Sequence, residues 1–202
     1  MRGKRCTIKP TRKTTKQSSS IQKVTISIID TGQEVLSGHP DFCTALMLQD
    51  EGGVEDANGF ATMVQIRGWA TDAVRRLKDE GLTPYEPVLV NIAGAAEDVA
   101  GILAVISAGG VAAPVHERAH PDMIRQVADQ TGARFHLNFK SSQGNRGVPD
   151  IQFIAPSSPA ARPLLDGAGM ITFTSGSTGR PKGAVLSLNR FTAKICSLQI
   201  KL

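Results

Sequence analysis

The sequence has few cysteines, and they are not arranged for cross-linking or metal binding. Cys6, Cys43 and Cys196 are far apart and form no C-x-x-C pair. An odd and scattered set argues against a disulfide framework and against a cysteine metal site. It favours a reducing compartment, so we expect a cytoplasmic protein, with a mitochondrial or peroxisomal location left open.

Long hydrophobic runs are also missing. The longest run without a charged residue, 99–115, contains Gly109, Gly110 and Pro114 and is shorter than the roughly 20 residues that a membrane span needs. The basic start of the chain leads into Thr, Lys and Ser rather than into the apolar centre of a secretory signal peptide. We therefore expect a soluble protein without stable membrane insertion.

Acidic residues are absent from residues 1–23, which hold eight of the 23 lysines and arginines. This Ser- and Thr-rich segment has no hydrophobic period and predicts a disordered basic tail. Organelle targeting and binding to nucleic acid or a membrane surface are its alternative roles. The rest of the chain holds 15 basic and 18 acidic side chains, so the folded body is mildly acidic and we expect no nucleic-acid partner. The oligomeric state is left open.

Helical and extended patterns alternate through the middle of the chain. Apolar residues at helical spacing predict an amphipathic helix over 60–82. The residues of this apolar stripe are Ile66, Trp69, Ala70, Ala73, Val74 and Leu77. Trp69 is expected in the core because it lies in this stripe. Gly81 follows as a C-terminal stop.

Strands and helices of similar length follow in turn. Strand-like runs lie at 24–29, 87–92, 111–115, 134–138 and 170–173, and helical runs begin at 97 and 121. Residues 51–59 are expected to form a loop or hairpin turn, and the proline-rich stretch 141–166 a surface connection. This alternation predicts an α/β fold with a doubly wound, mostly parallel sheet.

The last of these strands leads into a stretch rich in glycine and hydroxyl groups, which reads Thr174-Ser-Gly-Ser-Thr-Gly-Arg-Pro-Lys-Gly183. Its three glycines let a backbone approach a ligand closely, and successive loop N–H groups can form an anion-binding concavity. Hydroxyl groups add donors, and Arg180 and Lys182 add positive charge. The stretch therefore predicts a phosphate-binding loop, whose candidate residues are Thr174, Ser175, Gly176, Ser177, Thr178, Gly179 and Lys182.

Two common phosphate loops do not match this stretch. The P-loop needs G-x-x-x-x-G-K-[ST] opening into a helix, but Lys182 precedes Gly183, and Pro181 removes an N–H donor. The dinucleotide fingerprint places its glycines after a strand, whereas Gly167 and Gly169 precede this one. A plain flexible linker is the remaining alternative, and it would not be expected to follow a strand.

The string 173–183 instead resembles the phosphate-loop signature of the adenylate-forming superfamily, which is close to YTSGTTGxPKG. Phe173 replaces the common Tyr, and Ser177 the common Thr. Residues 60–190 resemble the family's N-terminal subdomain loosely, in the order of their elements. The resemblance implies that residues 24–202 are a truncated N-terminal AMP-binding domain, with residues 1–23 as its tail.

This resemblance also implies an activity. Members of the superfamily activate a carboxylic acid with Mg·ATP to give acyl-AMP and pyrophosphate, and a thiol then takes the acyl group. We expect an AMP-forming acid–thiol ligase of the acyl-CoA synthetase type, with ATP and Mg²⁺ as cofactors and CoA as co-substrate. The candidate loop would wrap the β- and γ-phosphates, and Lys182 would lie near the departing pyrophosphate. No catalytic or metal-binding residue is assigned, since the family's adenine pocket, metal-binding Glu and lid Lys come later, and the chain alone is expected to be inactive.

Two other functions stay open. The chain could be a non-catalytic remnant of this fold that binds a nucleotide or a partner. Alternatively, His116-Glu-Arg-Ala-His120 matches the H-E-x-x-H string of zinc hydrolases. That chemistry needs both histidines on one continuous helix with Glu117 beside the metal, whereas Pro114 and Pro121 flank the string. We therefore expect 116–120 to be a loop.

Overall fold

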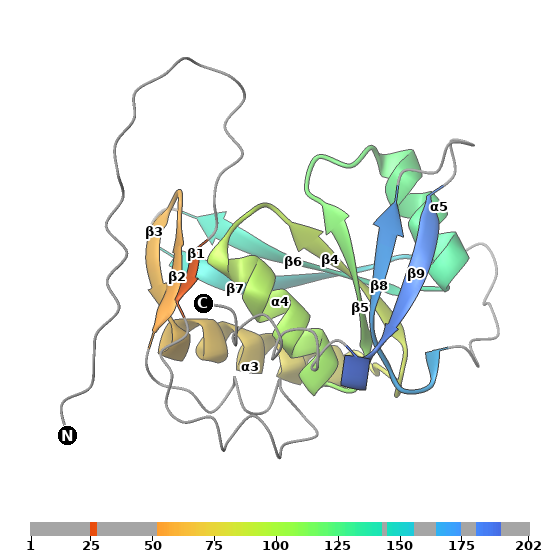
Figure 1. Ribbon diagram of the computed structural model, residues 1–202, viewed down its shortest axis with the longest axis horizontal. Coiled ribbons are helices and arrows are strands. Elements are labelled where there is room, and N and C mark those ends of the chain that lie inside the picture. Colours follow the sequence, from red (N-terminus) through yellow and green to blue (C-terminus); the bar gives the residue numbers. More distant parts are fainter. Residues whose placement is uncertain (1–24, 28–51, 143–144, 156–164, 175–180, 191–202) are drawn as a thin grey trace.

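The computed structural model of the chain describes residues 25–27, 52–142, 145–155, 165–174 and 181–190 (Figure 1). The predicted basic tail, 1–23, lies outside these ranges, as do residues 175–180 of the predicted phosphate loop. The described elements are β1 (Thr25–Ser27), β2 (Gly53–Asp56), β3 (Gly59–Thr62), α3 (Met63–Asp79), β4 (Pro87–Ile92), α4 (Ala96–Ser107), β5 (Val111–His116), α5 (Pro121–Thr131), β6 (Phe135–Ser142), β7 (Asn145–Phe153), β8 (Ala168–Thr174) and β9 (Lys182–Ser187).

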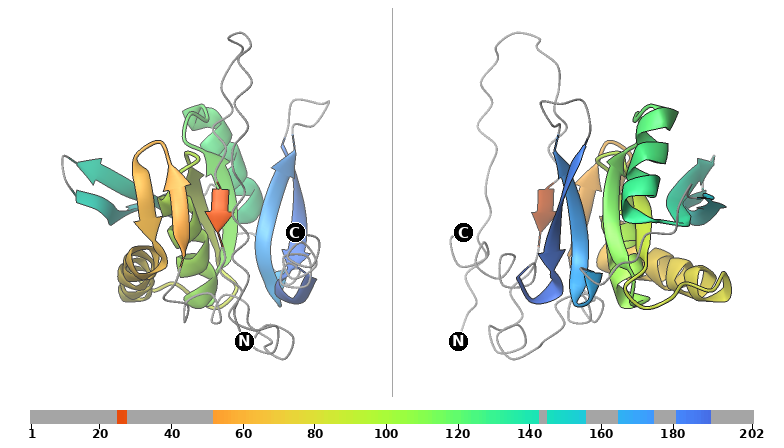
Figure 2. Two further views of the ribbon diagram at one scale, coloured as in Figure 1. Left: turned by 60° about the vertical axis from the view of Figure 1, so that its left-hand side comes forward. Right: turned by 90° about the vertical axis from the view of Figure 1, so that its right-hand side faces the viewer.

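A six-stranded sheet in the order β7-β6-β4-β5-β8-β9 forms the centre of the fold. The four inner strands, β6, β4, β5 and β8, run parallel to one another, and the edge strands β7 and β9 are antiparallel to β6 and β8. Figure 2 shows β6 and β7 at one side of the sheet and the β8–β9 hairpin at the other. A smaller antiparallel sheet, β1-β2-β3, precedes α3.

The helices cover both faces of the sheet. Residues of α3 and α4 pack on Val88 and Val90 of β4, whereas α5 packs on the side of Leu89. Since successive side chains of a strand point to opposite faces, α5 lies opposite the other two helices. The predicted doubly wound α/β fold is thus confirmed.

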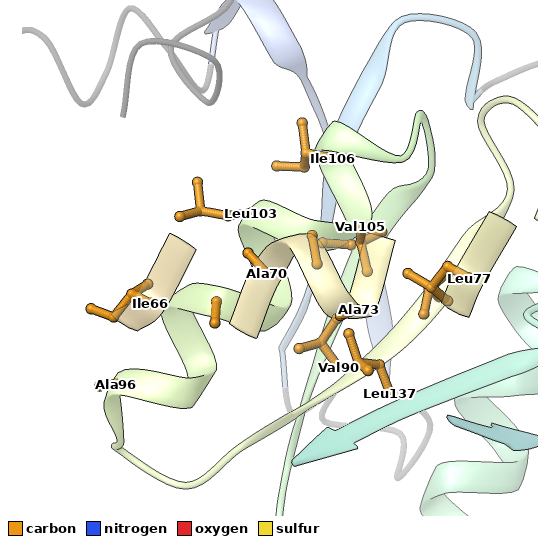
Figure 3. Close-up of a cluster of buried hydrophobic side chains, with 14 of the residues drawn as sticks. Ile66, Ala70, Ala73, Leu77, Val90, Ala96, Leu103, Val105, Ile106 and Leu137 are labelled. Carbon is orange, nitrogen blue, oxygen red and sulfur yellow. The ribbon is translucent and has the colours of Figure 1, made fainter. Parts of the chain in front are cut away.

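The predicted stripe of α3 faces the core. Its buried members are Ile66, Ala70, Ala73 and Leu77, whereas Trp69 and Val74 are partly buried against the same cluster. Figure 3 shows the four buried residues of α3 grouped with side chains of α4, β4 and β6. The 3.6-residue spacing of the sequence therefore identified this face correctly.

The predicted start of that helix is wrong. Phe60 and Ala61 belong to β3, which pairs with β2, and the helix begins only at Met63. Thr62 and Gln65 form a capping box, in which the Thr62 hydroxyl accepts from the Gln65 N–H (3.2 Å) and the Gln65 side chain accepts from the Thr62 N–H (2.9 Å). This reciprocal pair satisfies N–H groups at the helix start and fixes the boundary.

The prediction of a surface connection over 141–166 is wrong in its first half. Residues 145–153 form β7, which pairs antiparallel with β6. Pro149 lies inside this strand, opposite Phe139. Because β7 is an edge strand, Pro149 can occupy a position whose missing N–H would face away from the sheet.

A cluster of charged side chains connects the edge strand β7 to the rest of the domain. The Arg146 guanidinium donates to Asp56 (2.6 Å) and to both carboxylate oxygens of Glu97 (2.9 and 2.7 Å). It also lies over the Trp69 ring, 5.5 Å from its centroid. Hydrogen bonding to Glu97 raises the pKa of Arg146, and although burial opposes ionisation of Asp56, N–H donors and Arg146 together lower its pKa. Arg146 and Asp56 are therefore both charged near neutral pH.

Candidate functional site: the β8–β9 hairpin

The predicted phosphate loop connects β8 to β9. Thr174 ends β8 and Lys182 begins β9, and the two residues are register partners across the antiparallel pair. The hairpin therefore holds the two ends of the loop together. That Lys182 begins a strand was not indicated by the sequence, which predicted only the strand before the loop.

The two described ends of the loop are both available to a ligand. Thr174 and Lys182 are exposed, and Lys182 forms no ion pair with any residue in the described part of the chain. A hydroxyl and an uncompensated ammonium group thus lie opposite each other where the loop begins and ends. This pair can bind an anion, since charge-assisted hydrogen bonds are stronger than neutral ones. The other candidates, Ser175, Gly176, Ser177, Thr178 and Gly179, lie outside the described residues.

Gly183 has a packing role in the hairpin. A Cβ atom at this position would lie 3.1 Å from Phe173 Cε1 and 3.2 Å from Ile171 Cγ2. Gly183 and Phe173 are register partners, so the glycine leaves room for the aromatic ring of the preceding strand. The last glycine of the motif therefore lets the hairpin close beside the loop.

The hairpin places the loop at the edge of the sheet where ligands bind in this class of fold. β8 is parallel to β5, with Ala112 opposite Met170, and β5 is parallel to β4. The loop consequently follows the carboxyl end of a parallel strand, which is where open α/β sheets form their binding sites.

A second possible anion site at the same edge is filled by the chain itself. The Asp98 carboxylate accepts the N–H groups of Ala93, Gly94 and Ala95, at 2.7–3.1 Å, just before α4. Burial raises the pKa of Asp98, while these three donors act in the opposite direction. Because a side chain of the protein occupies these donors, the start of α4 does not offer them to a phosphate.

The H-E-x-x-H string does not form a zinc site of the hydrolase type. His116 is the last residue of β5, and His120 is the N-cap residue of α5. Between them, the Ala119 N–H donates to the His116 carbonyl in a turn. The two histidines thus do not lie one turn apart on a helix, as that chemistry requires. Across the described residues, no group of three or more His, Cys, Asp or Glu side chains is arranged for a metal ion.

Comparison with known proteins identifies the family. The model of the AMP-binding enzyme family matches residues 61–202, which is most of the chain, and the chain therefore belongs to this family. A nonribosomal peptide synthetase of Aspergillus flavus, imqB, is 27% identical over 185 residues, which are 86% of this chain and 5% of that protein. The expected membership of the adenylate-forming superfamily is confirmed.

Solved structures share the fold. IdnL1 matches with a TM-score of 0.64 and 16% identity, over 83% of this chain and 37% of that one. ATP-bound MatB from Rhodopseudomonas palustris matches with a TM-score of 0.52 and 18% identity, over 70% of this chain and 33% of that one. The chain thus spans about a third of these structures and a far smaller share of the synthetase.

No helix within the described ranges combines the length and apolar character required to cross a membrane.

Proposed function

We propose that this chain supplies the phosphate-binding part of an ATP-dependent ligase that joins a carboxylic acid to AMP. The observation that carries the proposal is the pairing of exposed Thr174 with exposed Lys182 at the ends of the motif loop. In the reaction, a carboxylate oxygen attacks the α-phosphorus of ATP, the acyl-adenylate forms, and pyrophosphate leaves. Lys182 and the loop donors would hold the phosphates that become pyrophosphate, which places the catalytic contribution in positioning and charge stabilisation.

The peptide synthetase relative favours an amino acid as the carboxylic acid. It also favours the thiol of a carrier protein over CoA as the acceptor, which differs from the acyl-CoA synthesis expected from the motif alone. ATP would arrive with Mg²⁺ on its phosphate oxygens, since this cation prefers oxygen ligands and phosphates. The described residues fit the phosphates rather than the metal, because the exposed groups at the loop ends are a hydroxyl and an ammonium.

Binding of inorganic pyrophosphate to the 202-residue chain tests the proposal. Titration calorimetry should detect binding, and Lys182→Ala should raise Kd by about tenfold or more, because it removes a contact with a charged group. Lys140→Ala is the matched control, since Lys140 is an exposed lysine of β6 that pairs with Asp150 (2.8 Å). It should leave Kd unchanged. Equal effects of the two changes would contradict the assignment of the loop.

The catalytic part of the proposal needs a separate measurement. The enzyme that carries this chain should exchange labelled pyrophosphate into ATP only when the correct amino acid is present. Pyrophosphate binding without exchange for any amino or carboxylic acid would instead support the non-catalytic remnant.

A further inference from the structure

The turn after β5 lies at the same edge of the sheet as the phosphate loop, yet the proposed function does not use it. β5 and β8 are adjacent and parallel, and they pair at Ala112 and Met170. Each strand continues for four residues beyond this pair, to His116 and to Thr174. Figure 1 shows both strands pointing toward the same end of the sheet. His116 and Thr174 are therefore the corresponding last residues of neighbouring strands.

Both side chains belong to the same face of the sheet. Ala112 packs in the cluster formed with α3 and α4, and His116 shares its face because strand side chains alternate with a period of two. In β8, Ile171 and Phe173 pack in the cluster of the opposite face, so Thr174 shares the face of His116. Both residues are exposed. An anion bound at Thr174 would thus lie on the side of the sheet toward which His116 projects.

The His116 ring is held with one nitrogen available for a ligand. Its Nδ1 atom accepts the backbone N–H of Arg118 at 3.1 Å, which places the hydrogen of the neutral ring on Nε2. The Nε2–H group is then a donor. The Arg118 guanidinium lies 3.4 Å from the Glu117 carboxylate, so the negative charge of the turn is compensated locally.

We propose that His116 is a further ligand-binding residue, whose Nε2–H donates to a phosphate oxygen of the nucleotide held between Thr174 and Lys182. The inference rests on the proposed function of the loop. It gives the turn of the H-E-x-x-H string a role in binding phosphate, and it requires no metal. The phosphate would then be held from two neighbouring strands, which fixes its position better than contacts from one loop.

Variants of His116 test this contact through pyrophosphate binding to the 202-residue chain. His116→Ala should raise Kd by about tenfold, the loss expected for a hydrogen bond to a charged group. His116→Gln should recover most of the affinity, because its amide N–H group can replace the Nε2–H donor. A role of His116 in folding alone would leave Kd unchanged in both variants once folding is verified by circular dichroism.

His120 provides the matched control. It lies in the same connection, and its Nδ1 atom also accepts a backbone N–H, that of Asp122 at 3.3 Å, but it caps α5. His120→Asn keeps a good N-cap residue and should leave Kd unchanged. If wild-type protein binds pyrophosphate and Lys182→Ala weakens binding while His116→Ala does not, the role of His116 is refuted and the loop assignment stands. If the wild type does not bind pyrophosphate, both are refuted.

Discussion

The two edges of the central sheet are held in different ways. At the β6–β7 edge, charged side chains connect strands to distant parts of the chain: Arg134 donates to buried Glu86 (2.6 Å), and Arg146 connects β7 to α4 and β2. At the β8–β9 edge, no ion pair joins residues of the described part of the hairpin, and the contact is backbone pairing. At the β6–β7 edge the charged side chains pair with one another and stabilise the fold. At the β8–β9 edge Lys182 is left available for a ligand.

This difference separates stability from function. A buried ion pair is costly to break, because the remaining partner is left charged and poorly solvated. An exposed hairpin loses little when one of its side chains changes, so its charges can be used for binding. We therefore expect changes at the β7 edge to act on folding, and changes at the β9 edge to act on affinity.

The largest expected effect is that of Arg146→Ala. It would leave the carboxylates of Asp56 and Glu97 buried without their common cation, and we expect the free energy of unfolding to fall by about 3–5 kcal/mol. Urea denaturation followed by circular dichroism measures this loss. Lys140→Ala removes the ion pair of a mostly exposed side chain at the same edge and should cost at most about 1 kcal/mol. Equal losses for the two variants would show that the buried cluster does not fasten the edge.

Alanine variants of two glycines, Gly147 in β7 and Gly167 just before β8, allow the stability of the two edges to be compared. Gly147 and Gly167 have nearly the same positive φ, 75° and 74°. A Cβ atom at Gly147 would overlap the Trp69 ring, whereas nothing lies within 4 Å of one at Gly167. Both alanine variants should lose about 1–2 kcal/mol from the strained conformation, and Gly147→Ala should lose about 1–3 kcal/mol more through overpacking. Thermal or urea unfolding that gave equal losses would disprove close packing of Trp69 on β7.

The smallest expected effect concerns His136 of β6, which is 8% exposed and whose Nε2 atom has no hydrogen-bond partner. Burial lowers the pKa of His136 below 6.5, and the nearby Asp150 carboxylate opposes this shift only in part. Below pH 6.5 the unfolded chain thus binds a proton that the folded chain does not. The free energy of unfolding should therefore fall as the pH drops from 6.5 toward the folded pKa, by up to about 1.4 kcal/mol per pH unit.

Replacing the imidazole isolates this dependence. His136→Leu should flatten the change in urea midpoint between pH 7 and pH 5, because no group then gains a proton at that site on unfolding. A slope that persists in His136→Leu would assign the dependence to another group.

The alternating elements in the middle of the chain could be predicted because their patterns are local. The spacing of Ile66, Ala70, Ala73 and Leu77 predicted the buried face of α3, and 87–92 proved to be β4. The start of α3 was misplaced because apolar Phe60 and Ala61 fit both a helix and a strand. Thr62 and Gln65 nevertheless carried a capping-box signal that would have set the boundary.

The strand β7 could not be predicted in the same way. Pro149 and Gly147 normally argue against a strand, and both are tolerated here only because β7 lies at an edge and one glycine makes room for Trp69. The ion cluster was equally hidden, since Arg146 meets Asp56 across 90 positions of sequence. Such contacts depend on the assembled sheet rather than on neighbouring residues.

The sequence alone identified the family and the stretch that we propose as the phosphate loop, because a contiguous motif carries its glycines, hydroxyls and charges wherever it folds. The tertiary structure decided what surrounds that motif. The antiparallel return of β9 puts Lys182 opposite Thr174, and the parallel pairing of β5 with β8 makes His116 the corresponding residue of the next strand. The physical reason is that strand register, which no short stretch of sequence specifies, sets which side chains share an edge of the sheet.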